Sequence, residues 1–414
     1  MEGIPVSEYR ERVRKVQELA RKKRFDAVLA YSGKRYSMGQ GVEDGQNLRY
    51  LVGFNFPPHE IQEKDVIVPY QSSESLLIIP TEDEPSLIIS KAETERTKKQ
   101  TWLQDVRTTT DKFANARYQG IAHITKDVLG AKRKVKLGLA GTNLPMDLYL
   151  ELTEVLPRTK LVSCTDELDL LRVIKSPNEL RIMRKAAEIA DEGVRALIET
   201  SRPGVAEYEV HMAVEKAMFD AGGDNPWSIV LSGPRSAISY LSPDYTQRKL
   251  REGDMVYADI GTELMGYHSD IQPASVVGRG TKDQLDLIET SVNMIKAMFN
   301  ATRPGATDTE VLRAAYKTLD GNPFRDHVRT WTFGHGYGVG VDPPDMTGST
   351  LTLPKSRQMK LRENMVLCFE PAVFVQGVGG AAVEDEVVVT SDGCEVISKC
   401  SERAEEFLEQ QRSH

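Results

Sequence analysis

The sequence predicts an α+β fold of two domains, an α/β domain at residues 1–165 and a larger domain of helices and strands at residues 170–414. Three observations carry this prediction. The chain has 414 residues, too many for one ordinary hydrophobic core. Its first third alternates helical and strand patterns. Its second half contains two similar segments, which predicts two half-units related by a pseudo-twofold axis.

The first domain is predicted to start with a charged amphipathic helix and to continue as a mixed sheet. Two apolar runs separated by the acidic turn TEDEP predict a hairpin. The expected elements are a helix at 7–23, strands at 26–31, 76–80, 86–90 and 134–141, and a helix at 145–156. Residues 32–60, rich in Gly, Asn, Asp and aromatic residues, predict a long loop that reaches toward a neighbouring subunit.

The second domain is predicted to begin with a long helix, because Ser176 is a good N-cap, Pro177 suits the first turn and Glu179 is acidic. The repeat lies downstream of this helix. The motif Arg-Pro-Gly at 202–204 recurs at 303–305, an offset of 303 − 202 = 101 residues. Two similar helix–turn–helix loops could arise by chance, whereas a duplicated half-unit would leave a cleft on the pseudo-twofold axis.

Composition excludes several classes of partner. A formal net charge of -8 disfavours nucleic acid, which needs a basic surface. No stretch approaches the roughly 18–20 apolar residues of a membrane helix, and the charged N-terminus has no signal-peptide core. The four cysteines are far apart and form no CxxC pair, as is usual in a reducing compartment. A cytoplasmic protein without a nucleic-acid or membrane partner is expected.

Five residues in strand-bearing segments carry the candidate chemistry: Asp259, Asp270, His335, Glu370 and Glu384. The two aspartates fit a strand, a tight turn and a returning strand, and the two glutamates adjoin apolar runs. A carboxylate in such a place is costly to bury unless a cation compensates it. Oxygen and imidazole donors suit Mn, Co, Fe or Zn, so we predict a site for two divalent metal ions.

Each of these residues also has an ordinary structural interpretation. The aspartates could cap turns, the histidine could be a hydrogen-bonded loop residue, and the glutamates could form salt bridges. Strand alternation places Asp385 on the face opposite Glu384 and Glu386 on the same face. His268, between the two aspartates, is expected to be a solvent-facing turn residue, with an outer-shell role as the alternative.

The ordered set of motifs resembles the creatinase/prolidase/methionine aminopeptidase ("pita-bread") family. The motifs are DIG followed by SD, the GHG histidine, the FEP glutamate and the VED glutamate, supported by IKSPNEL and the RPG turns. The resemblance covers roughly residues 170–400, and more weakly a creatinase-like N-terminal domain. It implies that the five residues are the metal ligands, that Glu370 shuttles a proton, and that the chain forms a homodimer.

The chain departs from this family where peptidase members carry two further histidines. Tyr240 and Asp342 stand at these positions, and Gln272-Pro273-Ala274 replaces the usual Thr-Arg-Thr. A phenol donates a hydrogen bond, whereas an ionised aspartate cannot. We therefore expect Tyr240 and Asp342 to orient a small cationic or zwitterionic substrate.

The predicted function is a dinuclear, metal-dependent hydrolase that cleaves the C–N bond of an amide or amidine in a small molecule or short peptide. An ordinary Xaa-Pro dipeptide is not the expected substrate. Three alternatives stay open: a lyase in which Asp342 removes a proton α to a carboxylate, a true Xaa-Pro aminopeptidase or dipeptidase, and a binding protein on a retired peptidase scaffold.

Overall fold

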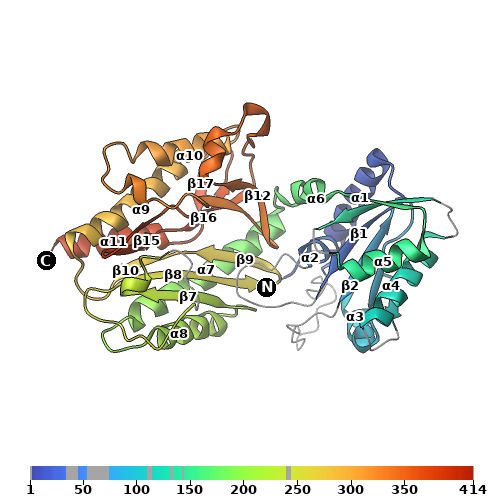
Figure 1. The fold of residues 1–414 in the computed structure, drawn as a ribbon, viewed down its shortest axis with the longest axis horizontal. Coiled ribbons are helices and arrows are strands. Elements are labelled where there is room, and N and C mark those ends of the chain that lie inside the picture. Colours follow the sequence, from blue (N-terminus) through green and yellow to red (C-terminus); the bar gives the residue numbers. More distant parts are fainter. Residues whose placement is uncertain are drawn as a thin grey trace. The chain divides into compact units, whose positions relative to one another are not determined.

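The computed structural model describes residues 2–33, 45–53, 74–109, 114–130, 134–141, 144–238 and 244–413. Within these ranges the chain separates into two compact units, one ending at Arg172 and the other starting at Val173. Figure 1 shows both units as mixtures of helices and strands. No helix in the described ranges combines the length and apolar content that crossing a bilayer requires.

The first unit is a six-stranded mixed sheet covered by helices. The strand order is β4-β3-β2-β1-β5-β6, with β1 antiparallel to β2 and parallel to β5. Its elements are α1 (Val6–Lys23), β1 (Ala27–Ser32), α2 (Gln46–Val52), β2 (Ser75–Pro80), β3 (Ser86–Ser90), α3 (Thr94–Gln100), β4 (Asp105–Thr109), α4 (Ala114–Leu129), β5 (Val135–Ala140), α5 (Met146–Val155), β6 (Thr159–Ser163) and α6 (Thr165–Arg172).

The predicted elements of this unit are present, and β2 and β3 form the expected antiparallel hairpin. One expectation was wrong: the stretch at 32–60 is not all loop, because it contains α2. Leu48 and Leu51 of this helix are fully buried, and the Tyr50 hydroxyl donates to the backbone oxygen of Leu171. Most of the remaining stretch, including the expected contact with a neighbouring subunit, lies outside the described residues.

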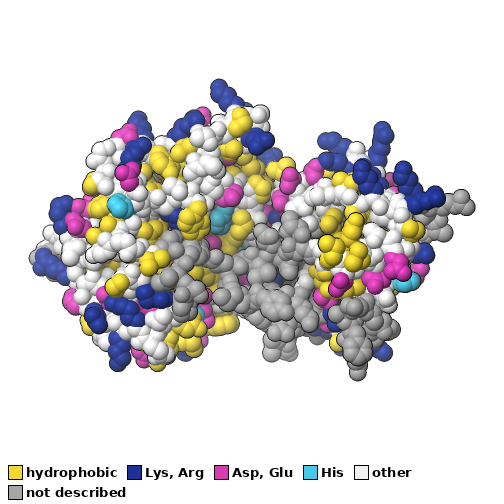
Figure 2. Space-filling model, viewed as in Figure 1, with side chains coloured by type: hydrophobic (Ala, Val, Ile, Leu, Met, Phe, Trp, Pro, Cys, Tyr) yellow, Lys and Arg dark blue, Asp and Glu magenta, His cyan; other side chains and the backbone are white. Residues whose placement is uncertain are grey.

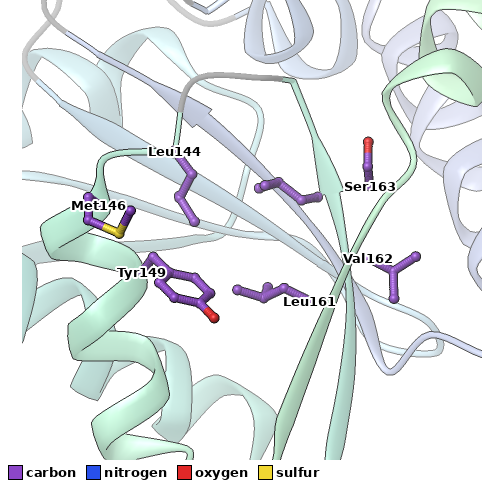
Figure 3. A pocket seen from close by; sticks show the side chains of 7 residues that line it. Leu144, Met146, Tyr149, Leu161, Val162 and Ser163 are labelled. Carbon is purple, nitrogen blue, oxygen red and sulfur yellow. The ribbon is translucent and has the colours of Figure 1, made fainter.

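An apolar pocket of about 360 Å³ opens on the first unit between β5, β6 and the start of α5. Figure 3 shows Leu144, Met146 and Tyr149 on one side of it, facing Leu161 of β6. Met146 is 69% exposed. Figure 2 shows apolar side chains gathered on the surface of this unit as well as on the second.

The second unit contains two related halves. The first half holds α7 (Pro177–Thr200), α8 (Glu207–Asp220), β7 (Trp227–Ser232), β8 (Met255–Leu264), β9 (Tyr267–Ile271) and β10 (Ala274–Val276). The second half holds α9 (Lys282–Ala301), α10 (Asp308–Lys317), β11 (Gly334–Tyr337), β12 (Val341–Met346), β13 (Val366–Phe369), β14 (Ala372–Val375), β15 (Gly379–Ala382), β16 (Asp385–Val389), β17 (Cys394–Val396) and α11 (Cys400–Arg412). One sheet has the order β10-β8-β7 with β9 on β8, a second has the order β12-β11-β13-β16-β17, and β14 and β15 form a two-stranded sheet.

The same hydrogen-bond pattern follows both Arg-Pro-Gly motifs. Gly204 N–H donates to the oxygen of Leu250, and Gly305 N–H donates to the oxygen of Leu361. Both glycines have positive φ, 92° and 87°, a conformation that favours glycine at the turn between two helices. The duplicated half-unit is therefore visible in the backbone as well as in the sequence.

Local chemistry explains the start of α7. The Ser176 hydroxyl accepts the N–H of Glu179 at 3.1 Å, and the Glu179 carboxylate accepts the N–H of Ser176 at 2.8 Å. This capping box satisfies donors that a helix start leaves without partners. The predicted start of the long helix is confirmed, and it directs α7 across β8 and β9.

Candidate metal centre

Asp259 and Asp270 lie on one hairpin. The turn between β8 and β9 contains Met265 and Gly266, whose φ values of 51° and 81° suit a tight two-residue connection. Asp270 pairs with Gly261, two residues beyond Asp259, so both carboxylates reach the same face. Asp259 is fully buried and Asp270 is 8% exposed. The spacing of the two aspartates therefore produced the predicted hairpin.

The other three predicted residues come from the second half. His335 lies on β11, Glu370 directly follows β13, and Glu384 directly precedes β16. The His335 Nε2 atom is 3.8 Å from Asp270 Oδ2 and 3.8 Å from Glu370 Oε1. Ligand atoms of Asp259, Asp270 and Glu384 lie within 4.8 Å of one another. The structure thus brings all five residues together, two from one half and three from the other.

The fit of this cluster to cations rests on its buried oxygens. Within the described part of the chain, neither Glu384 oxygen nor Asp270 Oδ1 has a hydrogen-bond partner, and Glu384 is fully buried. Burial, followed by the charges of neighbouring carboxylates, raises the pKa of Asp270 and of Glu384 well above their ordinary values. Buried carboxylates without partners cost free energy that divalent ions would offset. The donor set therefore fits the predicted ions.

Glu370 is held by three side chains, of which the sequence analysis had noted only Gln272, as a departure from the family pattern. Arg329 forms an ion pair with Glu370 Oε2 at 2.6 Å, and Gln272 donates to the same oxygen at 3.2 Å. The Thr332 hydroxyl donates to Glu370 Oε1 at 2.5 Å. Gln272 also donates to Asp259 at 3.2 Å. Gln272, two residues after Asp270, and Arg329, a cation six residues before His335, offered sequence signals for these contacts, whereas Thr332 offered none.

Cys368 is another nearby donor that the sequence analysis missed. It pairs across the sheet with His335, and its sulfur lies within 4.8 Å of ligand atoms of His335 and Glu384. Burial raises the pKa of this thiol well above its ordinary value, so the neutral form is favoured. A cysteine inside an apolar strand is indistinguishable from a core residue in sequence.

Strand alternation correctly separated Asp385 from Glu384 at the start of β16, and it left Glu386 on the same face as Glu384. Asp385 accepts the backbone N–H groups of Cys400 and Ser401 at the start of α11. Glu386 accepts the Ser269 hydroxyl at 2.8 Å, and burial raises its pKa to about 8. Glu384 alone of the three joins Asp259 and Asp270 in a group with metal-binding geometry.

The expected solvent exposure of His268 was wrong. His268 is 2% exposed, and its backbone N–H donates to the Gly338 oxygen. Its ring lies against Tyr337 with centroids 5.6 Å apart. These contacts place His268 of β9 against Tyr337 and Gly338 of the second half, and they cover the residue expected to face solvent.

The two residues predicted to handle substrate have different outcomes. Tyr240 lies outside the described residues. Asp342 is 2% exposed and forms an ion pair with Lys175 at 2.8 Å, and both side chains are buried. Because Lys175 neutralises this carboxylate, its expected use as a base or as a receptor for a cationic group loses support.

A duplicated unit that brings four carboxylates and one imidazole together is what a metallopeptidase catalytic domain requires. Comparison with known proteins gives the same class. The family model described as metallopeptidase family M24 matches residues 181–391, about half of the chain, and the chain belongs to this family. The model of the creatinase/prolidase N-terminal domain matches residues 12–174. The resemblance read from the motifs is therefore confirmed.

Individual relatives show how far the similarity extends. The Xaa-Pro dipeptidase of Pyrococcus furiosus is 32% identical over 233 residues, 55% of this chain and 64% of that protein. The chain thus spans slightly less than two thirds of this curated relative. The crystal structure of the prolidase from Pyrococcus horikoshii superposes with a TM-score of 0.76 at 26% identity, covering 94% of this chain and 98% of that one. Dipeptidase PepE from Mycobacterium ulcerans shares the fold, with a TM-score of 0.75.

Proposed function

We propose that this chain is a metal-dependent hydrolase that cleaves the C–N bond of an amide in a small molecule or short peptide. The observation that carries the proposal is the Glu384 carboxylate, which is fully buried beside three other carboxylates with no hydrogen-bond donor among the described residues. Membership of a metallopeptidase family supports the same activity.

In this proposal Asp259, Asp270, His335, Glu370 and Glu384 hold two divalent ions, with Mn, Co, Fe and Zn as the candidates. Glu384 belongs to both groups of neighbouring donors, which supports a site that would hold more than one ion. When bound, such ions polarise a carbonyl and lower the pKa of water to about 7.

Glu370 is proposed to carry the proton from the attacking water to the leaving nitrogen. Thr332 and Arg329 each donate to one of its oxygens, and these contacts hold the carboxylate in a fixed orientation. Oε2 accepts both Arg329 and Gln272, whereas Oε1 accepts only Thr332 and keeps a lone pair available for a proton or a cation. The surrounding donors therefore position the group that handles the proton.

The substrate is proposed to differ from an ordinary Xaa-Pro dipeptide, because Asp342 occupies a position where peptidase relatives carry histidine. Its ion pair with Lys175 gives it a positioning role, linking the strand after β11 to the start of α7. Tyr240 keeps its proposed role as a neutral donor to substrate. A lyase reaction would need Asp342 as a base, and its pairing with Lys175 disfavours that alternative.

The test begins with protein stripped by a chelator and reloaded with Mn, Co, Fe or Zn. Bound metal is measured by mass spectrometry, and Xaa-Pro dipeptides are compared with small amides and amidines in heavy-oxygen water. Label in the product identifies hydrolysis, whereas an unlabelled alkene identifies elimination. Glu384→Gln should lose metal and activity, while Glu395→Gln, an exposed surface glutamate paired with Arg184, should keep both. A reloaded wild-type protein that holds less than one metal ion per chain would overturn the proposal.

The homodimer is also proposed on the basis of the family resemblance, and the cytoplasmic location on the basis of the four separated cysteines. Light scattering coupled to size-exclusion chromatography measures the first, and a monomer across the working concentration range would contradict it.

A further inference from the structure

A second cavity, of about 250 Å³, lies in the second unit away from the donor cluster. It is bounded by the end of α7, by the segment containing β10, and by the first three turns of α11. Ile198, Val276 and Phe407 supply apolar walls. These elements can be followed in Figure 1 at the end of the unit that carries the C-terminal helix.

Three buried polar atoms line this cavity and lack hydrogen-bond partners among the described residues: Ser201 Oγ, Ser275 Oγ and Arg403 Nε. The Arg403 guanidinium also forms no ion pair within the described part of the chain. The three side chains are half-buried, and these atoms are the parts shielded from solvent. Shielded polar atoms normally have hydrogen-bond partners, so three such donors around one cavity mark it as a candidate ligand site.

The neighbouring charges limit the ligand to a single negative charge. Asp191 exerts an attraction on Arg403, but its carboxylate accepts the backbone N–H of Lys399 and makes no hydrogen bond to the guanidinium. Glu406, one helical turn from Arg403, is exposed at the cavity rim. The Glu406 carboxylate at the rim disfavours a dianion beside Arg403, and a planar carboxylate matches the fork of the arginine.

We propose that this cavity binds a small carboxylic acid with an apolar body, its carboxylate on Arg403 and the two serine hydroxyls, and its hydrocarbon against Ile198, Val276 and Phe407. The chemistry fits a simple branched-chain acid and equally a free hydrophobic amino acid, whose ammonium group would lie toward Glu406.

The cavity is connected by the backbone to the candidate metal centre. Pro273, Ala274, Ser275 and Val276 line the cavity and directly follow Gln272. Gln272 donates to both Asp259 and Glu370. A ligand that contacts Ser275 therefore lies three residues along the chain from Gln272, which contacts two of the candidate metal ligands.

Calorimetric titration of the chelator-treated full-length protein tests the binding. The probes are 4-methylpentanoate, L-leucine, isopentylamine and inorganic phosphate. We expect saturable binding of 4-methylpentanoate, of L-leucine or of both, and the tighter of the two identifies the source. The amine and phosphate should not bind. Absence of saturable binding by both carboxylates, or preference for phosphate, would overturn the proposal.

Variants distinguish this cavity from the metal centre, which could also attract a carboxylate. Arg403→Gln should weaken binding at least about tenfold, the loss typical of a charge-assisted hydrogen bond. Arg412→Gln removes an exposed arginine of the same helix, paired with Glu289, and should leave the affinity unchanged. If Arg403→Gln does not fold, Ser201→Ala and Ser275→Ala should each weaken binding several-fold. Unchanged affinity in all folded cavity variants would refute the proposal, whatever the outcome of the metal experiments.

Discussion

Replacing Glu384 by glutamine should have opposite effects on stability with and without metal. In chelated protein the buried carboxylate lies beside Asp259, Asp270 and Glu370 without a hydrogen-bond partner among the described residues, and burial and these charges raise its pKa. Glutamine removes the repulsion at nearly constant volume. The chelated Glu384→Gln protein should therefore unfold at a higher temperature than the chelated wild type.

Metal should reverse this order. A ligand at a thousand times its Kd stabilises the folded state by about 4 kcal/mol for each site. For a unit of this size, 1 kcal/mol shifts the Tm by about 2–4 °C, so one bound ion should raise the wild-type Tm by about 8–16 °C. Glu384→Gln, having lost a donor shared by both groups, should gain much less.

Differential scanning calorimetry, with chelator and then with excess Mn or Zn, measures both effects. Glu395→Gln serves as the control, because its carboxylate is exposed on the surface, and it should follow the wild type in both conditions. A chelated Glu384→Gln protein that is less stable than chelated wild type, together with no metal-dependent rise in the wild type, would refute the reasoning about the cluster.

Three further predictions concern the contacts around the site. Thr332→Val removes the donor to Glu370 Oε1 and should lower kcat roughly 5–10-fold with little change in KM. Thr332→Ser keeps the hydroxyl and should retain most of the activity. Steady-state kinetics measures both variants, and a Thr332→Val protein as fast as the wild type would contradict the assigned role. Lys175→Met removes the ion-pair partner of the buried Asp342 carboxylate and should lower the free energy of unfolding in urea by about 3–5 kcal/mol. The double variant Lys175→Met/Asp342→Leu should recover most of this loss. A Lys175→Met protein nearly as stable as the wild type would argue against the importance of the pair. Burial raises the pKa of Asp191 from 3.8 to about 7. Between these two pH values the folded state keeps a proton that the unfolded state releases. The free energy of unfolding should therefore fall by up to about 4 kcal/mol as the pH rises from about 4 to about 7. Asp191→Asn should remove that fall, and identical pH profiles for variant and wild type would contradict the assignment.

The sequence predicted the parts of the site that local spacing determines. Asp259 and Asp270 reached one face because a short turn between two strands leaves few other arrangements. The separation of Asp385 from Glu384 followed from strand alternation alone. The start of α7 followed from a serine, a proline and a glutamate that act within four residues of one another.

Contacts between distant segments could not be predicted in this way. Arg329 and Thr332 meet Glu370 across about forty residues of chain, and Lys175 meets Asp342 across far more. The helix α2 was missed because seven residues are too few for a helix to be stable by propensity. It depends on burying Leu48 and Leu51 in the folded unit, which a single sequence does not display.

The donors of the candidate centre are divided between two copies of one structural unit, and this division affects how the protein unfolds. Ions bound there would act as a cross-link between strands of the two halves. Loss of the ions would first separate β8 and β9 from β11 and β16, while the hydrogen bonds inside each sheet persist. Amide exchange in metal-free protein would then rise along this seam before it rises in either half, so that the supply of metal sets the rigidity of the junction.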